Sequence, residues 1–296
     1  MGNNNNYIAI RLSGGLGNQM FQYAFGLAVS LEKKCRLLVD FSNLENEHIL
    51  TSRRTFELGI FKDKFEELKL KLHFKKILNS RFKKFLSREN VFGPTIRFEK
   101  KFDFEKDLIE MKPPVLYIGY FQSPIYFEKY QERIRQTFQF NGSLLRVYHQ
   151  IVLEQIKDRN SVGIHIRRGD YVTNKKANAF HGVLKVDYYI RALNALKNVK
   201  NDLHVYVFSD DIEWVEHHFS FDLETYYVCT GNNDPTWTDM YLMSTCKHNI
   251  IANSTYSWWA AYLNSNPEKI VIAPKKWFND SNIYVDDLFP RSWIRM

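Results

Sequence analysis

Short apolar runs separated by polar stretches recur along the whole chain. In the first half, such runs predict strands over residues 7–12, 36–42 and 113–120, and apolar residues at helical spacing predict helices over 20–33 and 124–138. A strand, a helix and a second strand therefore open the chain. This order is typical of a parallel sheet whose strands are joined by helical crossovers.

The second half shows the same alternation more regularly. Five apolar runs predict buried strands, at 161–167, 203–208, 225–229, 248–252 and 269–273, and helical spacing separates them, near 185–198, 211–219, 235–246 and 257–264. Strands that alternate with helices predict a doubly wound parallel sheet, in which ligands bind at the carboxyl ends of the strands. We place a boundary near residue 150 and expect two α/β domains, 1–150 and 151–296, each with its own parallel sheet.

The composition allows two domains and favours an anionic ligand. The chain has 296 residues, of which 45% are hydrophobic, enough for two ordinary cores. Lysine and arginine exceed aspartate and glutamate by 41 to 33, so a net charge of +8 attracts nucleic acid, an anionic membrane or a phosphorylated small molecule. Three cysteines without a C-x-x-C motif, and an N-terminus without a secretory pattern, predict a reducing, cytoplasmic location.

Residues 62–88 carry ten lysines or arginines interleaved with large apolar residues. Three interpretations of this basic amphipathic segment stay open. It is a solvated helical pair that packs on its domain, a surface that rests on anionic lipid or a polyanionic acceptor, or a nucleic-acid contact. The last interpretation is the weakest, because no recognised nucleic-acid module accompanies the charge, and we expect no nucleic-acid partner.

The first strand predicted in the second half ends in a group of charged side chains. The run SVGIHIRRGDY contains His165, Arg167, Arg168 and Asp170. Two adjacent guanidiniums at the end of a buried strand are costly unless an anion binds there, and their planar forks suit the oxygens of a diphosphate. Alternation along the strand places Arg167 on the face of His165 and Arg168 on the opposite face. We therefore expect Arg167 to hold the diphosphate, and the structural alternative for Arg168 is a salt bridge to Asp170 or Asp210.

Two further segments lie where a strand meets a helix. SGGLGNQ, residues 13–19, contains glycines that let backbone N–H groups approach an anion at the start of a helix, although it matches neither common phosphate-loop motif and a plain tight turn is the alternative. A second such cradle is formed by Asn253, Ser254, Thr255 and Ser257. Helix capping needs only one of these four side chains, so we expect ligand contacts from the others. The following tryptophans, 258–259, are assigned to the core.

Adjacent carboxylates follow the strand predicted at 203–208. The segment FSDD, residues 208–211, either caps the next helix through Ser209 or Asp210 or places carboxylates at the ligand crevice. Metal binding is another use of such a pair, but the chain contains no D-x-D motif. We expect a mechanism without a metal or another cofactor.

Taken together, these segments resemble the α-1,2-fucosyltransferases. GGLGNQMFQYA at 14–24, HIRRGDY at 165–171, FSDD at 208–211 and NSTYSWWAAYL within 248–263 are similar to motifs of that family and occur in the same order. The resemblance implies a GT-B-like fold with two facing Rossmann-like domains, the first on the acceptor side and the second holding the donor. It also implies metal-independent transfer of L-fucose from GDP-β-L-fucose to the 2-hydroxyl of a terminal galactoside, with inversion.

The resemblance also implies roles for individual residues. Arg167 is expected on the β-phosphate with Arg168 nearby, and Asp239 is expected on the guanine. His165 is expected at the nucleoside. Further donor contacts are expected from Gly15, Gly17 and Asn18 of the glycine loop and from Asn253, Ser254, Thr255 and Ser257 of the last motif.

The base that deprotonates the acceptor hydroxyl has two candidates. Asp170 lies three residues beyond Arg167, but a carboxylate beside two guanidiniums is a weak base, and its alternative role is to orient them. His181 has a better intrinsic pKa for a base, and its alternatives are acceptor binding and core packing.

We expect a galactose-terminated oligosaccharide or a lipid-linked glycan as the acceptor, which would place the enzyme in the cytoplasm or peripherally at the inner membrane face. Another GDP-sugar transferase is the rival interpretation among related enzymes. A nucleotide phosphohydrolase or kinase is a more distant rival, although the Walker A motif is absent. A basic module that binds membrane or nucleic acid is the rival outside enzymes.

Overall fold

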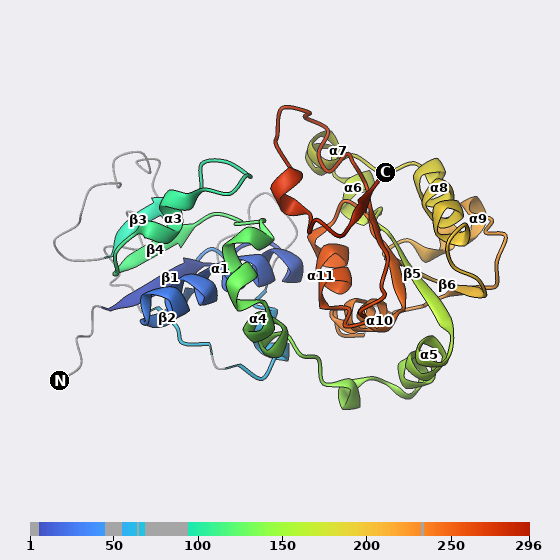
Figure 1. Cartoon of the computed structure of the whole chain (residues 1–296), viewed down its shortest axis with the longest axis horizontal. Coiled ribbons are helices and arrows are strands. Elements are labelled where there is room, and N and C mark those ends of the chain that lie inside the picture. The colour runs from blue at the N-terminus through green and yellow to red at the C-terminus, as the bar shows by residue number, and fades with distance from the viewer. Residues whose placement is uncertain (1–5, 45–54, 64, 69–93, 232–233) are drawn as a thin grey trace. The chain divides into compact units, whose positions relative to one another are not determined.

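The computed structural model describes residues 6–44, 55–63, 65–68, 94–231 and 234–296 (Figure 1). The chain divides into two compact units, Met1–Gln139 with Tyr284–Phe289 and Phe140–Ile283 with Pro290–Met296. This division precedes the boundary that we expected near residue 150. Helix α5 (Val147–Asp158) packs on strand β5 (Asn160–Ile166) of the second unit, and a boundary at 150 would cut this helix.

The first unit contains a four-stranded parallel sheet. Its strands are β1 (Tyr7–Arg11), β2 (Arg36–Asp40), β3 (Thr95–Phe98) and β4 (Val115–Ile118), in the order β2-β1-β4-β3. The pairings are parallel, as the strand, helix and strand at the start of the chain predict. The sequence pattern missed β3, a short edge strand in which only Ile96 is buried.

Helix α1 (Leu16–Lys33) connects β1 to β2 and is mostly buried from Leu16 to Ser30. Gly26 allows its close approach to the sheet, because a Cβ there would lie 2.9 Å from Leu37 Cδ1. The helix ends at Lys34, whose left-handed backbone with φ of 51° turns the chain toward β2. Since α1 starts four residues before the predicted helix, only residues 13–15 of the glycine loop lie between β1 and α1, and residues 16–19 belong to the first turn of α1.

Shorter elements complete the first unit. They are η2 (Leu58–Ile60), α3 (Lys106–Glu110), η4 (Pro124–Tyr130), α4 (Gln131–Thr137) and η6 (Asp286–Leu288). The helix predicted over 124–138 is therefore a 3-10 helix followed by an α-helix. The segment that contains η6 returns from the far end of the sequence, which no sequence pattern indicated.

The second unit contains a six-stranded parallel sheet in the order β10-β9-β8-β5-β6-β7. Besides β5, its strands are β6 (Leu203–Ser209), β7 (Thr225–Tyr227), β8 (His248–Ile250), β9 (Val271–Ala273) and β10 (Ile294–Arg295). Five of the six confirm strands predicted from the sequence. The two-residue strand β10 was missed because it carries too short a pattern.

Helices α8 (Val186–Lys197), α9 (Ile212–His218), α10 (Thr238–Thr245) and α11 (Thr255–Leu263) lie where the sequence predicts helices. Three others, α5, α6 (Gly169–Thr173) and α7 (Lys175–His181), and the 3-10 turn η5 (Gly142–Leu144) were not predicted. Side chains of β5, β6 and α8 form the centre of the core, including Val162, Ile164, Val205 and Leu193.

The strand order of the second sheet reverses at β5. The chain runs from β5 to β6 and β7 on one side, and then returns to add β8, β9 and β10 on the other. In open α/β sheets, ligands bind outside the strand ends at such a switch point. The arginines at 167–168 immediately follow β5, so they lie at this point.

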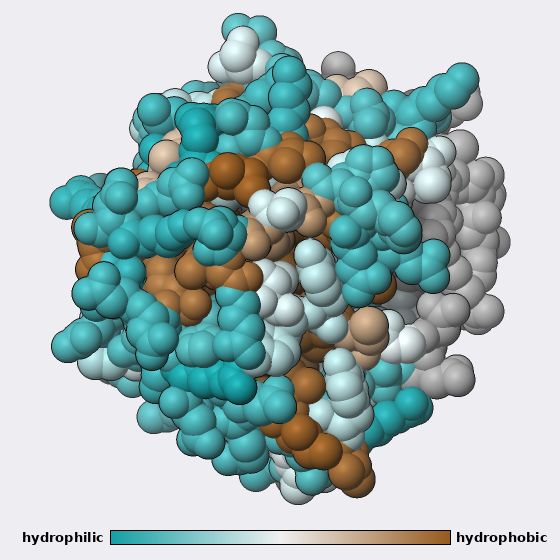
Figure 2. All heavy atoms as spheres, turned by 90° about the vertical axis from the view of Figure 1, so that its right-hand side faces the viewer, coloured by the Kyte–Doolittle hydropathy of each residue, from teal (hydrophilic) through white to brown (hydrophobic). Residues whose placement is uncertain are grey.

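The face drawn in Figure 2 is mostly hydrophilic, with hydrophobic residues confined to smaller areas. None of the helices in the described part of the chain is long and apolar enough to cross a membrane. Most of the basic segment 62–88 lies outside the described residues, so the interpretations of that segment stay predictions.

Candidate functional site

The carboxyl ends of β5 and β6 bring two charged pairs together. The two strands are in parallel register, with Ile166 opposite Ser209 at their ends. The arginines 167–168 follow one strand and the carboxylates 210–211 follow the other. Because parallel strands end at the same edge of a sheet, these side chains meet there.

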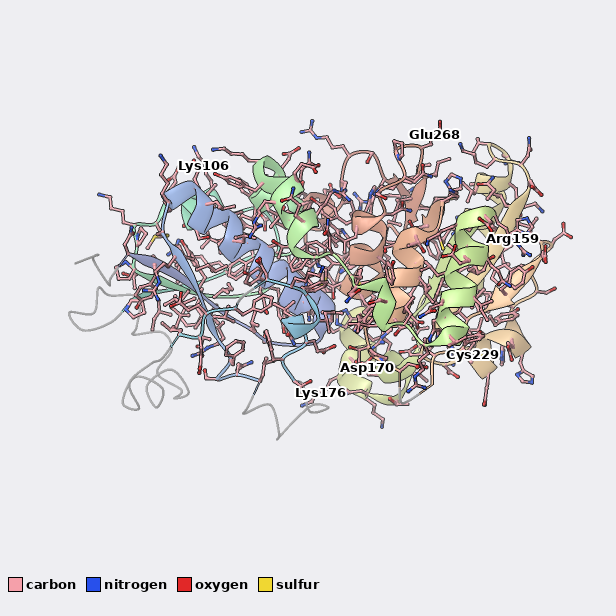
Figure 3. The ribbon with its side chains drawn as sticks, turned by 90° about the horizontal axis from the view of Figure 1, so that it is seen from below. Lys106, Arg159, Asp170, Lys176, Cys229 and Glu268 are labelled. Carbon is pink, nitrogen blue, oxygen red and sulfur yellow. The ribbon has the colours of Figure 1, made fainter. Side chains whose placement is uncertain are left out.

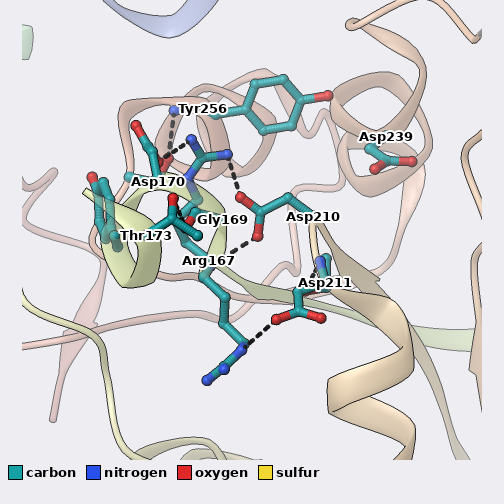
Figure 4. Close-up of polar contacts among 12 residues, drawn as sticks. Arg167, Gly169, Asp170, Thr173, Asp210, Asp211, Asp239 and Tyr256 are labelled. Carbon is teal, nitrogen blue, oxygen red and sulfur yellow. Dashed lines mark hydrogen bonds and ion pairs between the residues drawn. The ribbon is translucent and has the colours of Figure 1, made fainter. Parts of the chain in front are cut away.

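Arg167 is held by two carboxylates. Its Nη2 donates to Asp170 Oδ1 at 2.6 Å, and its Nη1 lies 2.8 Å from Asp210 Oδ2, so the guanidinium bridges α6 and the end of β6 (Figure 4). Burial alone would lower the pKa of Arg167, but the two carboxylates outweigh burial and the pKa is raised. Arg167 is therefore a fixed cation, with 26% of its side chain still exposed.

Arg168 has partners of its own. Its Nε donates to Asp211 Oδ2 at 2.9 Å, and its guanidinium carbon lies 3.3 Å from the centre of the Trp214 ring. Its backbone N–H donates to Asp210 Oδ1 at 2.8 Å. The salt bridge that we expected from the Arg168 side chain to Asp170 or Asp210 is wrong, because both carboxylates bind the preceding arginine and the register of β6 places Asp211 against Arg168.

The segment FSDD binds arginines and does not cap α9. The helix starts after Asp211, and no side chain accepts a hydrogen bond at its N-cap. Ser209 Oγ accepts from the Asp211 N–H at 3.1 Å, which fixes the turn between β6 and α9. Within the described residues, no three His, Cys, Asp or Glu side chains are grouped to hold a metal ion.

Gly169 gives Asp210 room to reach both arginines. A Cβ at position 169 would lie 2.3 Å from Asp210 Oδ2 and 3.0 Å from Asp210 Cγ. Real Cβ atoms do not approach a neighbour as closely as 2.3 Å, and Oδ2 is the oxygen that faces Arg167. The glycine of the HIRRGD run is therefore a packing requirement of the arginine cluster, which the sequence alone did not reveal.

Asp239 presents a buried carboxylate oxygen. The residue lies in the first turn of α10, and its Oδ2 accepts a hydrogen bond from Thr230 Oγ1 at 3.0 Å. Its Oδ1 is buried without a hydrogen-bond partner among the described residues. Burial raises the pKa of Asp239 to about 7. The negative charges of Asp234 and Asp210 also raise this pKa, whereas the hydrogen bond from Thr230 lowers it. A ligand that donates a hydrogen bond to Oδ1 would supply the partner that this buried oxygen lacks.

Two imidazoles beside the cluster are neutral at pH 7. Burial, with the charge of Arg167, lowers the pKa of His165 to about 3. Burial lowers the pKa of His181 to about 4, although Asp170 opposes the shift. The Nδ1 atom of each ring is buried without a hydrogen-bond partner in the part of the chain that the structure describes. A base with so low a pKa is weak, which argues against His181 in that role.

Stacking and helix packing hold His181 in its position. It ends α7, and its ring stacks on that of Tyr171 with 4.6 Å between ring centres. Tyr171 belongs to α6, and α6 and α7 pack together. Asp170 of α6 and Lys176 of α7 are labelled in Figure 3. His181 therefore packs within the fold, which is one of its predicted alternatives, and its contact with an acceptor stays a prediction.

The side chains of the last motif are largely used within the fold. The amide nitrogen of Asn253 donates to three backbone carbonyls, one of them that of His181. Ser254 caps α11 by accepting a hydrogen bond from a backbone N–H, and Ser257 donates to carbonyls of the preceding turn. Their donor contacts, and those of Thr255, stay predictions. The tryptophans 258–259 are fully buried, as predicted.

In the first unit, the glycine loop is held by two buried glutamines that sequence reasoning missed. Gln19 Nε2 donates to the Gly14 carbonyl at 2.9 Å, and Gln22 Oε1 accepts from the Ser13 N–H at 3.0 Å. Gly14 has a left-handed φ of 72°, which favours glycine. Asn18 Oδ1 accepts a hydrogen bond from the Gln122 side chain at 3.1 Å. Both missed residues lie in the run GNQMFQYA, where amides on a buried helix were the available signal.

The three residues of the loop that were predicted to contact the donor lie at the start of α1. Gly15 is the N-cap of α1, and Gly17 and Asn18 lie in its first turn. The loop is thus an ordered strand-to-helix connection that presents a helix N-terminus, the arrangement that binds anions in other proteins. Contacts from Gly15, Gly17 and Asn18 to a donor stay predictions.

Comparison with known proteins assigns the chain to a family. The model of glycosyl transferase family 11 matches residues 2–296, nearly the full length. The chain belongs to glycosyl transferase family 11. The resemblance found in the four sequence motifs is thereby confirmed at the level of the family.

Curated relatives of this family 11 protein include enzymes from bacteria and animals. The chain is 36% identical over 310 residues to the O-antigen biosynthesis glycosyltransferase WbnK of Escherichia coli, which covers 96% of this chain and 99% of the relative. It is 35% identical to an alpha-1,2-colitosyltransferase of Escherichia coli, over 98% of each chain. It is also 27% identical over 168 residues to the human galactoside alpha-(1,2)-fucosyltransferase 1, with 53% of this chain and 46% of the relative covered.

Solved structures with the same fold are fucosyltransferases. The NodZ alpha-1,6-fucosyltransferase co-crystallized with GDP matches with a TM-score of 0.54 and 13% identity, over 88% of this chain and 92% of that chain. A variant of Arabidopsis thaliana FUT1 in complex with GDP matches with a TM-score of 0.55 and 14% identity, over 92% of this chain and 71% of that chain. The family 11 chain therefore has the GT-B-like α/β fold with parallel sheets that the sequence predicts.

Proposed function

We propose that this family 11 glycosyltransferase transfers L-fucose from GDP-β-L-fucose to the 2-hydroxyl of a terminal galactoside, with inversion and without a metal ion. The observation that carries the proposal is the Arg167 guanidinium, which two carboxylates fix at the end of β5. A planar, permanently charged donor at a sheet switch point suits the diphosphate of a nucleotide sugar. The human α-1,2-fucosyltransferase relative supports the choice of sugar and linkage.

In the proposed reaction, Arg167 acts on the leaving group. The acceptor oxygen attacks the anomeric carbon in line as the bond to the β-phosphate oxygen breaks, and negative charge develops on the departing GDP. A guanidinium that is already oriented stabilises this charge without reorganising during the reaction. Backbone N–H groups at the start of α11 are further proposed donors for the phosphates.

Asp239 is proposed to recognise the guanine base. Its buried Oδ1 lacks a partner among the described residues, and an ionised carboxylate can accept hydrogen bonds from the N1–H and the exocyclic amino group of guanine. Adenine has no such pair of neighbouring donors. The proposal therefore requires stronger binding of GDP than of ADP, and this preference should disappear in Asp239→Asn. His165, buried and neutral, is proposed to offer a ring nitrogen to the nucleoside.

A second candidate donor is GDP-colitose. It is favoured by the relative named alpha-1,2-colitosyltransferase, which is 35% identical over nearly the whole chain. Colitose is fucose without its 3-hydroxyl, so both donors would present the same diphosphate and base to this site. The choice between them therefore depends on the contacts of one hydroxyl group.

The proposed acceptor is a galactose-terminated oligosaccharide or a lipid-linked glycan. The O-antigen biosynthesis relative supports an acceptor of this kind. A lipid-linked acceptor would bring the enzyme to the inner membrane face, where a net charge of +8 favours contact with anionic lipid.

The decisive experiment is GDP release from each donor in the presence of EDTA, with a panel of galactose-terminated acceptors. We expect release with GDP-fucose that depends on the acceptor, and nuclear magnetic resonance of the product should show an α-linkage to the 2-hydroxyl of galactose. Faster turnover of GDP-colitose would select the second candidate. Activity only after a divalent metal is added, or no activity with any galactoside, would refute the proposal.

A further inference from the structure

The first turn of α10, which carries Asp239, is not capped by its own N-cap residue. That residue is Trp237, whose side chain makes no capping hydrogen bond in the part of the chain that the structure describes. In many helices, a side-chain oxygen at the N-cap accepts the N–H of the second or third helical residue. An indole has no such acceptor, so the N–H of Met240, the third residue of α10, needs a partner from another element.

Tyr256 supplies this partner from the neighbouring helix. Its hydroxyl oxygen accepts the Met240 N–H at 2.8 Å and donates its own proton to the Thr236 carbonyl at 2.6 Å. One phenol therefore bonds the backbone before and after the point where α10 begins. Tyr256 is the second residue of α11, which packs on α10, and Figure 4 shows its hydroxyl end directed toward Asp239.

The carboxylate of Asp239 depends on this backbone for its position. Its Oδ2 accepts from Thr230 Oγ1 at 3.0 Å, which orients the carboxyl group, and its Oδ1 is the buried oxygen without a hydrogen-bond partner among the described residues. Hydrogen bonds require heavy-atom distances of about 2.7–3.2 Å. A shift of the first turn of α10 by about 1 Å would therefore misplace Oδ1 for a ligand that enters from a fixed direction.

The same tyrosine contacts the second residue that is proposed for the nucleoside. The centre of its ring lies 5.7 Å from that of His165, which belongs to β5. Its backbone N–H donates to the hydroxyl of Ser254, the N-cap of α11. Tyr256 thus joins β5, α10 and α11, the three elements that supply His165, Asp239 and the last motif.

We propose that Tyr256 is a positioning residue for recognition of the guanine base. Its hydroxyl fixes the first turn of α10 so that Asp239 meets the N1–H and the exocyclic amino group of guanine together. This inference rests on the proposed function and adds a residue to it. Phenylalanine at this position would keep the ring beside His165 and lose both hydrogen bonds of the hydroxyl. The contact with the base should then weaken, while the contact of Arg167 with the diphosphate should not.

The test compares Tyr256→Phe with the wild type by calorimetry with three probes: GDP, inosine 5′-diphosphate and inorganic pyrophosphate. Inosine keeps the N1–H of guanine but lacks the amino group, and pyrophosphate has no base. We expect Tyr256→Phe to bind GDP about tenfold more weakly, the effect of one misplaced hydrogen bond to a carboxylate. It should lose most of the preference for GDP over inosine diphosphate and bind pyrophosphate within about twofold of the wild type.

A matched control separates positioning from a general loss of structure. Tyr188→Phe removes another buried hydroxyl of the second unit, which lies 2.8 Å from the Ile251 carbonyl and 3.3 Å from that of Ile272. This variant should have a lower Tm and keep the preference for GDP over inosine diphosphate. Amide hydrogen exchange tests the cause directly, because the Met240 N–H should exchange faster in Tyr256→Phe and at the wild-type rate in Tyr188→Phe.

A double variant tests whether the hydroxyl acts through Asp239. Tyr256→Phe combined with Asp239→Asn should bind GDP within about twofold of Asp239→Asn alone. The inference is overturned if Tyr256→Phe keeps the wild-type preference for GDP over inosine diphosphate, weakens all three probes equally, or adds its full effect to that of Asp239→Asn. If Asp239→Asn instead keeps the preference for GDP over ADP, the guanine contact of the proposed function fails, whatever the hydroxyl of Tyr256 does.

Discussion

Replacing Gly169 by alanine tests whether Asp210 positions the guanidinium of Arg167 for the diphosphate. The new Cβ would lie 2.3 Å from Asp210 Oδ2, whereas ordinary contacts begin at 3.4 Å, so the carboxylate must shift by about 1 Å. The backbone at Gly169 does not require a left-handed φ, and alanine is therefore tolerated by the main chain. The substitution acts through the carboxylate alone.

The expected loss follows from the contacts that the shift disturbs. Asp210 lies 2.8 Å from Arg167 Nη1 and accepts the Arg168 N–H at 2.8 Å. A hydrogen bond to a charged group contributes about 1.5–3 kcal/mol net. Losing the contact that fixes Arg167 should therefore lower kcat/KM by roughly tenfold to a hundredfold, since about 1.4 kcal/mol corresponds to a factor of ten.

The assay is GDP release under steady-state conditions, with GDP affinity measured by calorimetry. Gly59→Ala is the matched control, because the nearest atom to a Cβ there is Phe56 Cε1 at 3.4 Å, an ordinary contact. A kcat/KM for Gly169→Ala within about threefold of the wild type, or an equal loss in Gly59→Ala, would refute the reasoning.

Four further predictions concern the remaining charged groups of the site. Arg167→Ala should lower kcat/KM by two or more orders of magnitude, which corresponds to about 3 kcal/mol or more of transition-state stabilisation. Near-normal GDP release would contradict the proposed binding of the diphosphate by Arg167. Because the pKa of Asp239 is raised to about 7, GDP affinity should fall in calorimetry as the pH drops through that value, and it should stay flat in Asp239→Asn. Between pH 3.8 and about 7 the folded state keeps the Asp239 proton while the unfolded chain loses it, so the free energy of unfolding falls as the pH rises through this window. Asp239→Asn should therefore raise the Tm measured without GDP more at about pH 8 than at about pH 4. Arg168→Lys should lower the Tm through loss of about 1–2 kcal/mol from the Trp214 stack and the Asp211 bond, while leaving GDP affinity closer to the wild type than Arg167→Lys does.

Local patterns were sufficient to place most strands and the arginine pair. Buried parallel strands are apolar runs in the sequence, so five of the six strands of the second sheet were predicted. The strand β3 was missed because an edge strand has only one well-buried residue, Ile96, and shows no such run. Alternation along β5 indicated that Arg167 and Arg168 have different surroundings, which the structure confirms.

The partners of the arginines could not be predicted in the same way. Which carboxylate meets which guanidinium depends on the register between β5 and β6, and the two strands are more than thirty residues apart in the sequence. The neutral state of His181 has a similar origin. Its ring packs against Phe278 and Tyr171, so burial lowers its pKa to about 4, and no local pattern brings residue 278 to that position.

The contacts of Arg167 also explain why an arginine is required at this position. A guanidinium carries five N–H groups on three nitrogens in one plane, whereas an ammonium carries three on one atom. Nη1 and Nη2 each bind one carboxylate, so the guanidinium has two anchors and still carries further N–H groups in the same plane for a phosphate oxygen. A lysine would have to give up its anchor to take the phosphate.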